Sequence, residues 1–308
     1  MEHLPVLFEE ALHFLKIEAD GWYLDCTFGR GGHSRGILQQ LDESGRLLAI
    51  DRDVEAIESV NAQELQKDKR FVLYHGRFSE LTKAVELYDA VGKVRGVLMD
   101  LGVSSPQLDT ADRGFSFLQD GPLDMRMDGS AGMTAAQWLA EVEENELSKV
   151  LFEYGEERFA RKIARTIVER RQREALRTTL QLARLIEDVI PYREKHKHPA
   201  TRTFQAIRIA LNQELQEIEE GLEQAVQVLA PGGRLVVISF HSLEDRIVKR
   251  FIRAESGRKF NPGRLPVLER DIEQGRLKTI DKAIRAGQEE LRRNPRARSA
   301  VMRVAEKR

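Results

Sequence analysis

The stretch Asp25-Cys-Thr-Phe-Gly-Arg-Gly-Gly-His-Ser34 decides the fold, and it overlaps the end of a short apolar, β-prone run, Trp22–Thr27. Its glycines allow the backbone to turn sharply and to approach a ligand closely. A helix is expected to start beyond them, near Gly36, and the N–H groups of its first turn are then free to face that ligand. A strand, a glycine-rich turn and a helix in this order are typical of an α/β fold.

Further strands and helices alternate after this turn. Strands are predicted at residues 46–51, 71–74 and 94–100, and helices at 54–66 and 78–88. Such alternation implies parallel strands joined by right-handed crossovers.

The α/β pattern is interrupted in the middle of the chain and then returns. Residues 101–133 are rich in Gly, Ser, Pro and Asp and predict a long ordered loop of functional importance. Thr134 to Gln137 form a capping box that opens a purely helical block. The elements expected beyond it are helices at 146–154, 156–173, 179–189 and 203–229, and strands at 234–239 and 299–304. We therefore expect an α/β domain in two parts, residues 1–108 and 200–308, with an inserted helical domain at 109–199.

Composition is typical of a globular protein of 308 residues, with 41% hydrophobic and 32% charged residues. At roughly 150 residues per domain, two domains are expected. No signal peptide is visible, and no run approaches about 18 apolar residues, so a membrane span is not expected. The single cysteine, Cys26, excludes an internal disulfide and fits a reducing compartment, which predicts a cytoplasmic protein.

The net charge of −1 conceals an asymmetry along the chain. Residues 246–308 contain 19 Lys and Arg against 8 Asp and Glu, whereas the preceding part is acidic. This basic end suggests an anionic partner, although local pairing of a solvated tail is an equally good explanation. The basic residues considered for phosphate contacts are Arg202, Arg208, Lys249, Arg250, Arg253, Arg292, Arg293, Arg296 and Arg298.

The glycine turn predicts an adenosine ligand when it is combined with Asp51. A dinucleotide fingerprint needs a third glycine where this chain has Ser34, and no P-loop lysine follows. Asp51 lies 20 residues beyond Gly31 at the end of the second strand, where an acid accepts hydrogen bonds from ribose hydroxyls. NAD and S-adenosylmethionine both fit, and the missing glycine favours the ligand without a phosphate. The alternative is a plain tight turn with a solvated acid.

A second candidate segment follows the fourth strand, Asp100-Leu-Gly-Val-Ser-Ser-Pro-Gln107. Ligands of open α/β sheets lie beyond the carboxyl ends of the strands, so this loop is expected beside the glycine turn. Methyltransferases of exocyclic amino groups place a short Asp/Asn/Ser-Pro-Pro-aromatic motif here. The aromatic is absent, so base stacking must come from elsewhere; the candidates are Phe115, Phe117 and Phe240.

Taken together, the motifs resemble the bacterial small-subunit ribosomal RNA cytosine-N4 methyltransferases of the MraW type, from the N-terminus to the last predicted strand. The segments that carry the resemblance are Gly29–Ser34, Asp100–Asp109, Arg113–Phe117, Gly121–Asp128, His198–Ile209, Ile238–Asp245 and Asn294–Ala300.

The resemblance implies a Rossmann-like class I methyltransferase sheet with an inserted all-helical domain. It implies that S-adenosylmethionine is the methyl donor, and that the acceptor is the N4 amino group of one cytidine in the decoding region of small-subunit ribosomal RNA. The donor-binding residues carried over by motif are Gly31, Gly32, His33, Asp51, Phe78, Asp100 and Gln107. Arg30 departs from the family pattern, where a small residue is expected.

For the chemistry, Ser104, Ser105 and Pro106 are the residues expected to position the target amino group through side-chain or backbone oxygens. An exocyclic amine needs no covalent adduct, so Cys26, inside the first strand, is expected to be a buried structural thiol. The spacings of His33, His198 and His241 match no zinc pattern, and no metal is expected.

Two other functions stay open on the sequence alone. One is an NAD-dependent oxidoreductase, against which the missing third glycine counts. The other is a non-catalytic RNA-binding or ribosome assembly factor that keeps a nucleotide pocket.

Overall fold

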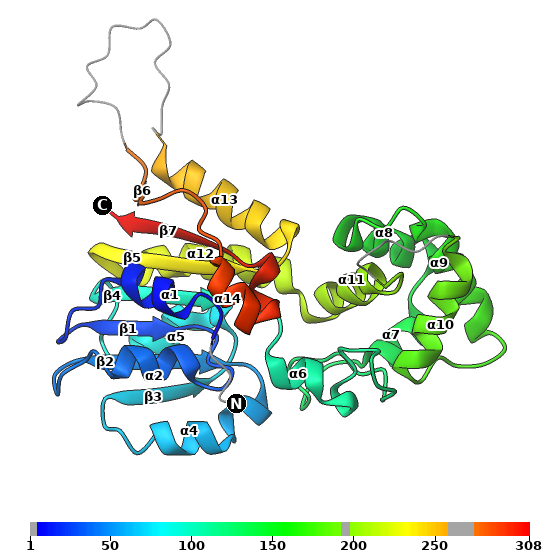
Figure 1. Ribbon diagram of the computed structural model, residues 1–308, viewed down its shortest axis with the longest axis horizontal. Coiled ribbons are helices and arrows are strands. Elements are labelled where there is room, and N and C mark those ends of the chain that lie inside the picture. Colours follow the sequence, from blue (N-terminus) through cyan, green and yellow to red (C-terminus); the bar gives the residue numbers. More distant parts are fainter. Residues whose placement is uncertain (1–4, 192–197, 258–273) are drawn as a thin grey trace, which may run out of the picture. The chain divides into compact units, whose positions relative to one another are not determined.

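The computed structural model describes residues 5–191, 198–257 and 274–308, which form two compact units. The first unit comprises residues 1–102 and 215–308, and the second comprises residues 103–214 (Figure 1). Each unit is described by itself. The helical insertion is thus longer at both ends than the predicted range 109–199. None of the described helices has the length and apolar composition that a membrane crossing requires.

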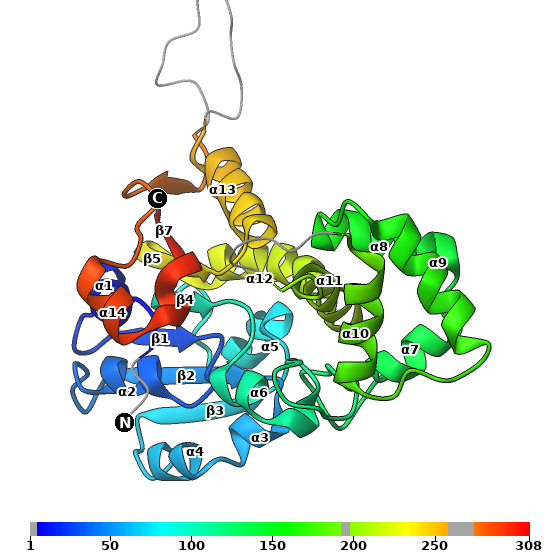
Figure 2. The ribbon, with the colours of Figure 1, turned by 45° about the vertical axis from the view of Figure 1, so that its right-hand side comes forward.

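The first unit is built on a seven-stranded sheet in the order β3-β2-β1-β4-β5-β7-β6 (Figures 1 and 2). The pairs among β1 to β5 are parallel, whereas β7 is antiparallel to both β5 and β6. The strands are β1 (Trp22–Asp25), β2 (Arg46–Asp51), β3 (Phe71–His75), β4 (Val94–Asp100), β5 (Leu229–Ser239), β6 (Leu277–Thr279) and β7 (Val301–Lys307). The predicted parallel α/β sheet is confirmed.

Both faces of this sheet are buried, because alternate residues of the same strand enter different apolar clusters. In β2, Leu48 and Ile50 pack with α5 (Leu81–Glu86), α12 (Glu214–Val228) and α13 (Ser242–Ser256). Leu47 and Ala49 join the opposite cluster. The helices of that cluster are α1 (Phe8–Leu15), α2 (Gly32–Leu38), α3 (Val54–Ile57) and α4 (Val60–Leu65). The result is a helix–sheet–helix sandwich.

Several local predictions for the first unit were wrong in their bounds. The predicted helix 54–66 is two helices, α3 and α4, since Ser59 starts α4 as its N-cap. The predicted helix 78–88 is a 3₁₀ turn, η1 (Phe78–Glu80), followed by α5. The segment Ala230–Gly233, predicted as the break that follows a helix ending at Leu229, belongs to β5, where the pairing with β4 is irregular.

The second unit contains helices around one apolar core. They are α6 (Ser105–Asp109), η2 (Ala111–Arg113), α7 (Ala135–Glu141), α8 (Glu144–Gly155), α9 (Ala160–Arg171), α10 (Thr179–Val189) and α11 (Thr201–Asn212). The predicted capping box of Thr134 and Gln137 is confirmed at the start of α7. Residues 101–133, predicted as a loop, contain α6 and η2.

The predicted single helix 203–229 is wrong, because α11 ends at Asn212 and α12 starts at Glu214. Gln213 adopts a left-handed conformation with φ of +54°, which a continuous α-helix does not permit. Phe204 and Ile207 of α11 are buried in the core of the helical unit. This burial explains why the insertion extends beyond residue 199.

Asn212 fastens the end of α11 inside the helical unit. Its amide nitrogen donates to the carbonyl oxygens of Met125 (2.8 Å) and Arg208 (2.9 Å). Its amide oxygen accepts from the N–H of Met127 at 2.8 Å. Arg208 also forms a two-pronged ion pair with Glu214, across the break between the two helices. The break is therefore held by buried polar contacts.

Candidate functional site

The turn between β1 and α2 has the sharp geometry that its glycines predict. Gly29 and Gly31 have φ of +55° and +73°, in the region that favours glycine. A β-carbon at Gly31 would lie 2.7 Å from both Leu65 and Phe28. The turn therefore requires glycine at residue 31 for conformation and for space.

Asp51, at the end of β2, is tied directly to this turn. Its Oδ2 accepts the N–H of Gly29 at 2.7 Å, and its Oδ1 accepts the N–H of Asp53 at 2.8 Å. Burial, with a contribution from the charges of Asp53 and Asp25, raises the pKa of Asp51 to about 6. Each carboxylate oxygen has a second lone pair, so the side chain can still accept hydrogen bonds from a ligand.

Beside the turn, the buried His33 and the half-buried Asp100 have buried polar atoms without a hydrogen bond from any described residue. His33 lies in the first turn of α2 with 5% of its surface exposed, and its Nε2 is 3.7 Å from Oδ2 of Asp100. Neither ring nitrogen of His33, nor Oδ1 of Asp100, forms a hydrogen bond among the described residues. Buried polar atoms are normally paired, so these atoms indicate where a polar ligand is bound.

Asp25, which the sequence analysis did not single out, lies close enough to His33 for their charges to interact. It is almost fully buried, and its Oδ2 accepts the hydroxyl of Ser34 at 2.6 Å. Burial raises the pKa of Asp25, while the neighbouring His33 lowers it. The sequence contained one signal for Asp25, namely its place at the end of a strand directly before a glycine turn. Its hydrogen bond with Ser34 could be identified only from the structure.

Phe78 has packing contacts with a helix and with the apolar core of the first unit. Its ring packs against Gly221 of α12, where a β-carbon would lie 2.6 Å from it, and against the apolar cluster below. A role in binding the donor stays a prediction for this residue.

Ser104, Ser105, Pro106 and Gln107 belong to the helical unit and start helix α6. Ser104 is the N-cap of this helix, and its backbone N–H donates to Oε1 of Gln107 at 2.9 Å. Both side chains thus take part in a capping box. Their predicted roles toward donor and acceptor remain predictions.

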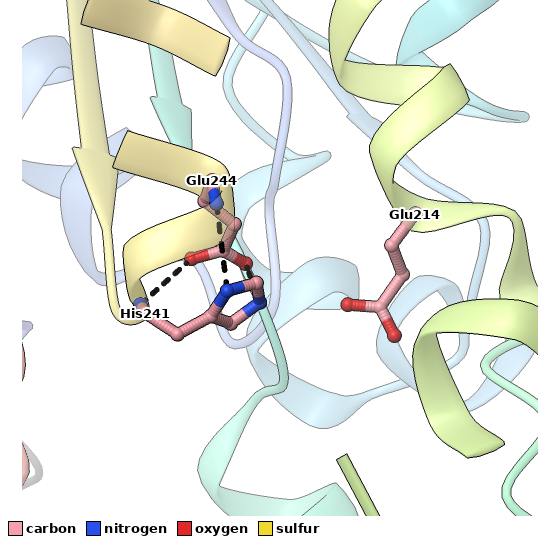
Figure 3. Close-up of side chains that lie close together, drawn as sticks. All are labelled: Glu214, His241 and Glu244. Atoms are coloured by element: carbon pink, nitrogen blue, oxygen red, sulfur yellow. Dashed lines mark hydrogen bonds and ion pairs between the residues drawn. The ribbon is translucent and has the colours of Figure 1, made fainter. Parts of the chain in front are cut away.

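The turn after β4 lies beside the turn after β5 within the first unit. A β-carbon at Gly102 would lie 3.7 Å from both Glu244 and Phe240. The fully buried Glu244 accepts the N–H groups of Phe240 (2.7 Å) and His241 (3.2 Å). Figure 3 shows the contact between His241 and Glu244. Nδ1 of His241 in turn accepts the N–H of Glu244, so His241 caps α13. This reciprocal pair explains His241 as a structural residue.

The helical unit contains an aromatic pocket of about 330 Å³. The ring of Phe117 lies 4.5 Å from that of His198 and 4.8 Å from that of Phe204, measured between centroids. Phe115, Gln205 and Arg208 also line the pocket. Of the three aromatic residues proposed for base stacking, Phe115 and Phe117 therefore share one pocket, whereas Phe240 belongs to the other unit.

Cys26 is buried next to the turn. Burial raises the pKa of its thiol well above the usual value, so the nucleophilic thiolate is disfavoured. This environment agrees with a structural thiol.

Comparisons with known proteins decide the family. The family model described as the MraW methylase family matches residues 1–308. The chain belongs to the MraW methylase family. Three relatives, each named ribosomal RNA small subunit methyltransferase H, match almost the whole chain. The relative from Methylococcus capsulatus is 58% identical over 98% of this chain and 99% of its own length.

The other two relatives are similar over equal lengths. The protein from Thioalkalivibrio sulfidiphilus is 56% identical and that from Alteromonas mediterranea 52% identical, each over 99% of this chain and 97% of its own length. The resemblance stated from the sequence motifs is thus confirmed. So is S-adenosylmethionine as the methyl donor of this MraW methylase.

The residues at the carboxyl edge of the sheet fit this donor. Asp51 offers acceptors for ribose hydroxyls, and the buried Oδ1 atom of Asp100 offers an unused acceptor for an ammonium group. The donor carries a positive sulfonium, and the acids Asp25, Asp51 and Asp100 favour a cation there.

Proposed function

We propose that this MraW methylase transfers a methyl group from S-adenosylmethionine to the N4 amino group of a cytidine in the decoding region of small-subunit ribosomal RNA. The proposal places the protein in the cytoplasm, acting on RNA within the small subunit. Its main support is the 52–58% identity, over nearly complete chains, to proteins named ribosomal RNA small subunit methyltransferase H.

The donor site in this proposal consists of Gly31, Gly32, His33, Asp51 and Asp100 in the first unit. S-adenosylmethionine supplies an activated methyl group on a positively charged sulfur. Asp51 accepts hydrogen bonds from the ribose hydroxyls, while the glycines let the backbone approach the donor closely. His33 and Asp100 bind the polar end of the donor with the atoms that form no hydrogen bond among the described residues.

Two further donor contacts, from Phe78 and Gln107, follow from the resemblance alone. Because the Phe78 ring is packed on Gly221, the proposed contact with the donor has to use the part of the ring that Gly221 does not cover. Oε1 of Gln107 accepts the N–H of Ser104, so the proposed contact of Gln107 with the donor has to be compatible with this capping bond.

The acceptor amine is a weak nucleophile, because its lone pair is delocalised into the cytosine ring. We assign its positioning to Ser104, Ser105 and Pro106, whose oxygens accept the amino hydrogens and draw the lone pair out of conjugation. Positioning is the chief requirement, since the donor is already activated. The proton then leaves to water, and no residue is assigned as a base.

The pKa of Asp51 predicts how donor binding depends on pH. The ionised carboxylate is the better acceptor, and it is lost as the pH falls through about 6. We therefore expect the dissociation constant for S-adenosylmethionine to be about tenfold larger at pH 5 than at pH 7, measured by calorimetry. Asp51→Asn should lose this part of the pH dependence. An affinity that is constant from pH 5 to pH 7 would contradict the assignment.

The aromatic pocket of the helical unit is assigned to a base of the RNA. Unstacked bases bind on aromatic side chains, and one such stack is worth about 1–3 kcal/mol. We expect Phe117→Ala to raise KM for small subunits about tenfold, with the dissociation constant for the donor unchanged. Phe152→Ala is the matched control, because Phe152 is 66% exposed on α8 and does not line the pocket. Equal KM values for the two variants would exclude the pocket.

The function is tested by incubating the protein with radiolabelled S-adenosylmethionine and small subunits, followed by mass mapping of the labelled nucleotide. Label at N4 of one cytidine in the decoding region is expected. Label on another atom or base would refute the acceptor assignment. Absence of label, with donor binding intact, would favour the assembly-factor alternative.

A further inference from the structure

One long-range hydrogen bond joins the segment before the first helix to a helix near residue 290. The backbone N–H of Leu7 donates to Oε1 of Glu290 at 2.7 Å, although the two residues are 283 positions apart. Leu7 is fully buried and has φ of +53°, a left-handed conformation that is costly for a leucine. The helix that follows Leu7 has no N-cap hydrogen bond from the Leu7 side chain. Glu290 supplies an acceptor for one of the backbone N–H groups at this strained helix start.

The segment held in this way, Pro5–Phe8, packs on the residues assigned to the donor. A β-carbon at Gly32 would lie 2.3 Å from Cγ of Pro5, so the proline closes directly over this glycine. The ring of Phe8 lies 5.8 Å from that of His33 and covers Gly36 of the same helix. The segment therefore forms a wall against the turn and the first part of α2.

The helix that carries Glu290 packs against an apolar cluster of the first unit. This helix, α14 (Gln288–Arg293), packs through Leu291, and the following 3₁₀ turn, η4 (Pro295–Ser299), buries Ala297. Burial raises the pKa of Glu290, and the charges of Glu9 and Glu10 act in the same direction. Its neighbour Glu289 is 77% exposed and pairs only with Arg293 of the same helix among the described residues.

We propose that Glu290 is a positioning residue of the donor site, which holds the wall Pro5–Phe8 against Gly32 and His33 and thereby sets the affinity for S-adenosylmethionine. It acts through the N–H of Leu7 and does not itself touch the donor. The inference rests on the proposed assignment of the glycine turn to donor binding.

The test compares three variants by calorimetry with S-adenosylmethionine and with S-adenosylhomocysteine. Glu290→Ala is expected to weaken both affinities about tenfold, the effect of losing one hydrogen bond to a charged acceptor. Glu290→Gln keeps an acceptor oxygen and should stay within about threefold of the wild type. Glu289→Ala is the matched control and should leave both affinities unchanged.

Two further measurements separate positioning from a loss of fold. Pro5→Gly removes the wall contact without touching the Glu290 hydrogen bond, and should also weaken the donor affinity. In Glu290→Ala, KM for the donor should rise while kcat and KM for small subunits remain unchanged. Hydrogen exchange should accelerate in α1 and leave β1 and β4 protected.

The outcomes that overturn the proposal are distinct from failure of the donor site itself. If Glu290→Gln binds the donor as weakly as Glu290→Ala, the charge of Glu290 sets the affinity and the positioning role of its hydrogen bond is refuted. If Asp51→Ala weakens donor binding but Glu290→Ala does not, only the positioning role of Glu290 is wrong. If neither variant changes the affinity, the assignment of the donor site to this turn fails as well.

Discussion

Replacing Asp51 by alanine should weaken S-adenosylmethionine binding about a hundredfold, the largest single loss expected in the donor site. The side chain joins the end of β2 to the glycine turn through Gly29, and it is the acceptor assigned to the ribose hydroxyls. Two hydrogen bonds to a charged acceptor, at about 1.5 kcal/mol each, account for this loss. Calorimetry with the wild type and the variant measures it directly.

Two checks make the Asp51 result specific. Glu58→Ala removes an exposed acid at the end of α3 and should leave the affinity unchanged. A melting curve of Asp51→Ala must accompany the titration, because relief of a buried charge and loss of two internal hydrogen bonds oppose each other in stability. An affinity within threefold of the wild type, in a folded variant, would remove Asp51 from the site.

Replacing Asn212 by alanine should lower the free energy of unfolding of the helical unit by about 3 kcal/mol. Asn212 is 3% exposed and satisfies the backbone of Met125, Met127 and Arg208 with three hydrogen bonds. Each buried polar group left without its partner costs about 1–3 kcal/mol, and partial relaxation or hydration of the freed groups keeps the total near the lower part of the sum.

The two tryptophans make this prediction measurable, because Trp22 lies in β1 and Trp138 in α7. Urea unfolding followed by Trp138 fluorescence, in a Trp22→Phe background, reports on the helical unit. Gln172→Ala removes an exposed amide from the end of α9 in the same unit and should change stability by less than about 0.5 kcal/mol. If Asn212→Ala behaves like this control, the break between α11 and α12 is held by other contacts.

The strands were predictable where burial on both faces gives a continuous apolar run. Residues 46–51 and 94–100 were predicted with the bounds that β2 and β4 have. The short edge strand β6 has no such run, because only Leu277 of its three residues is buried. The left-handed Gln213 was also unpredictable, since the contacts that hold it come from residues 125–127, far away in the sequence.

In the candidate site, too, some features were predictable from the sequence and others were not. The glycine turn and Asp51 were predicted, because strand ends and glycine spacing are local signals, and the structure joins them through Gly29. The hydrogen bond of Ser34 to Asp25 and the hydrogen bond of Leu7 to Glu290 were not predicted. Both depend on side chains that meet only when the chain is folded, and neither leaves a periodic pattern.

The insertion of the helical unit between β4 and β5 has a consequence for the speed of folding. These strands are neighbours in the sheet, yet residues 103–214 separate them along the chain, and β5 also needs β7 on its other side. Most pairing in the centre of the sheet is therefore of high contact order, and loop closure must precede it. Refolding from denaturant should accordingly be slow, with the helical segment regaining its structure before the sheet is complete.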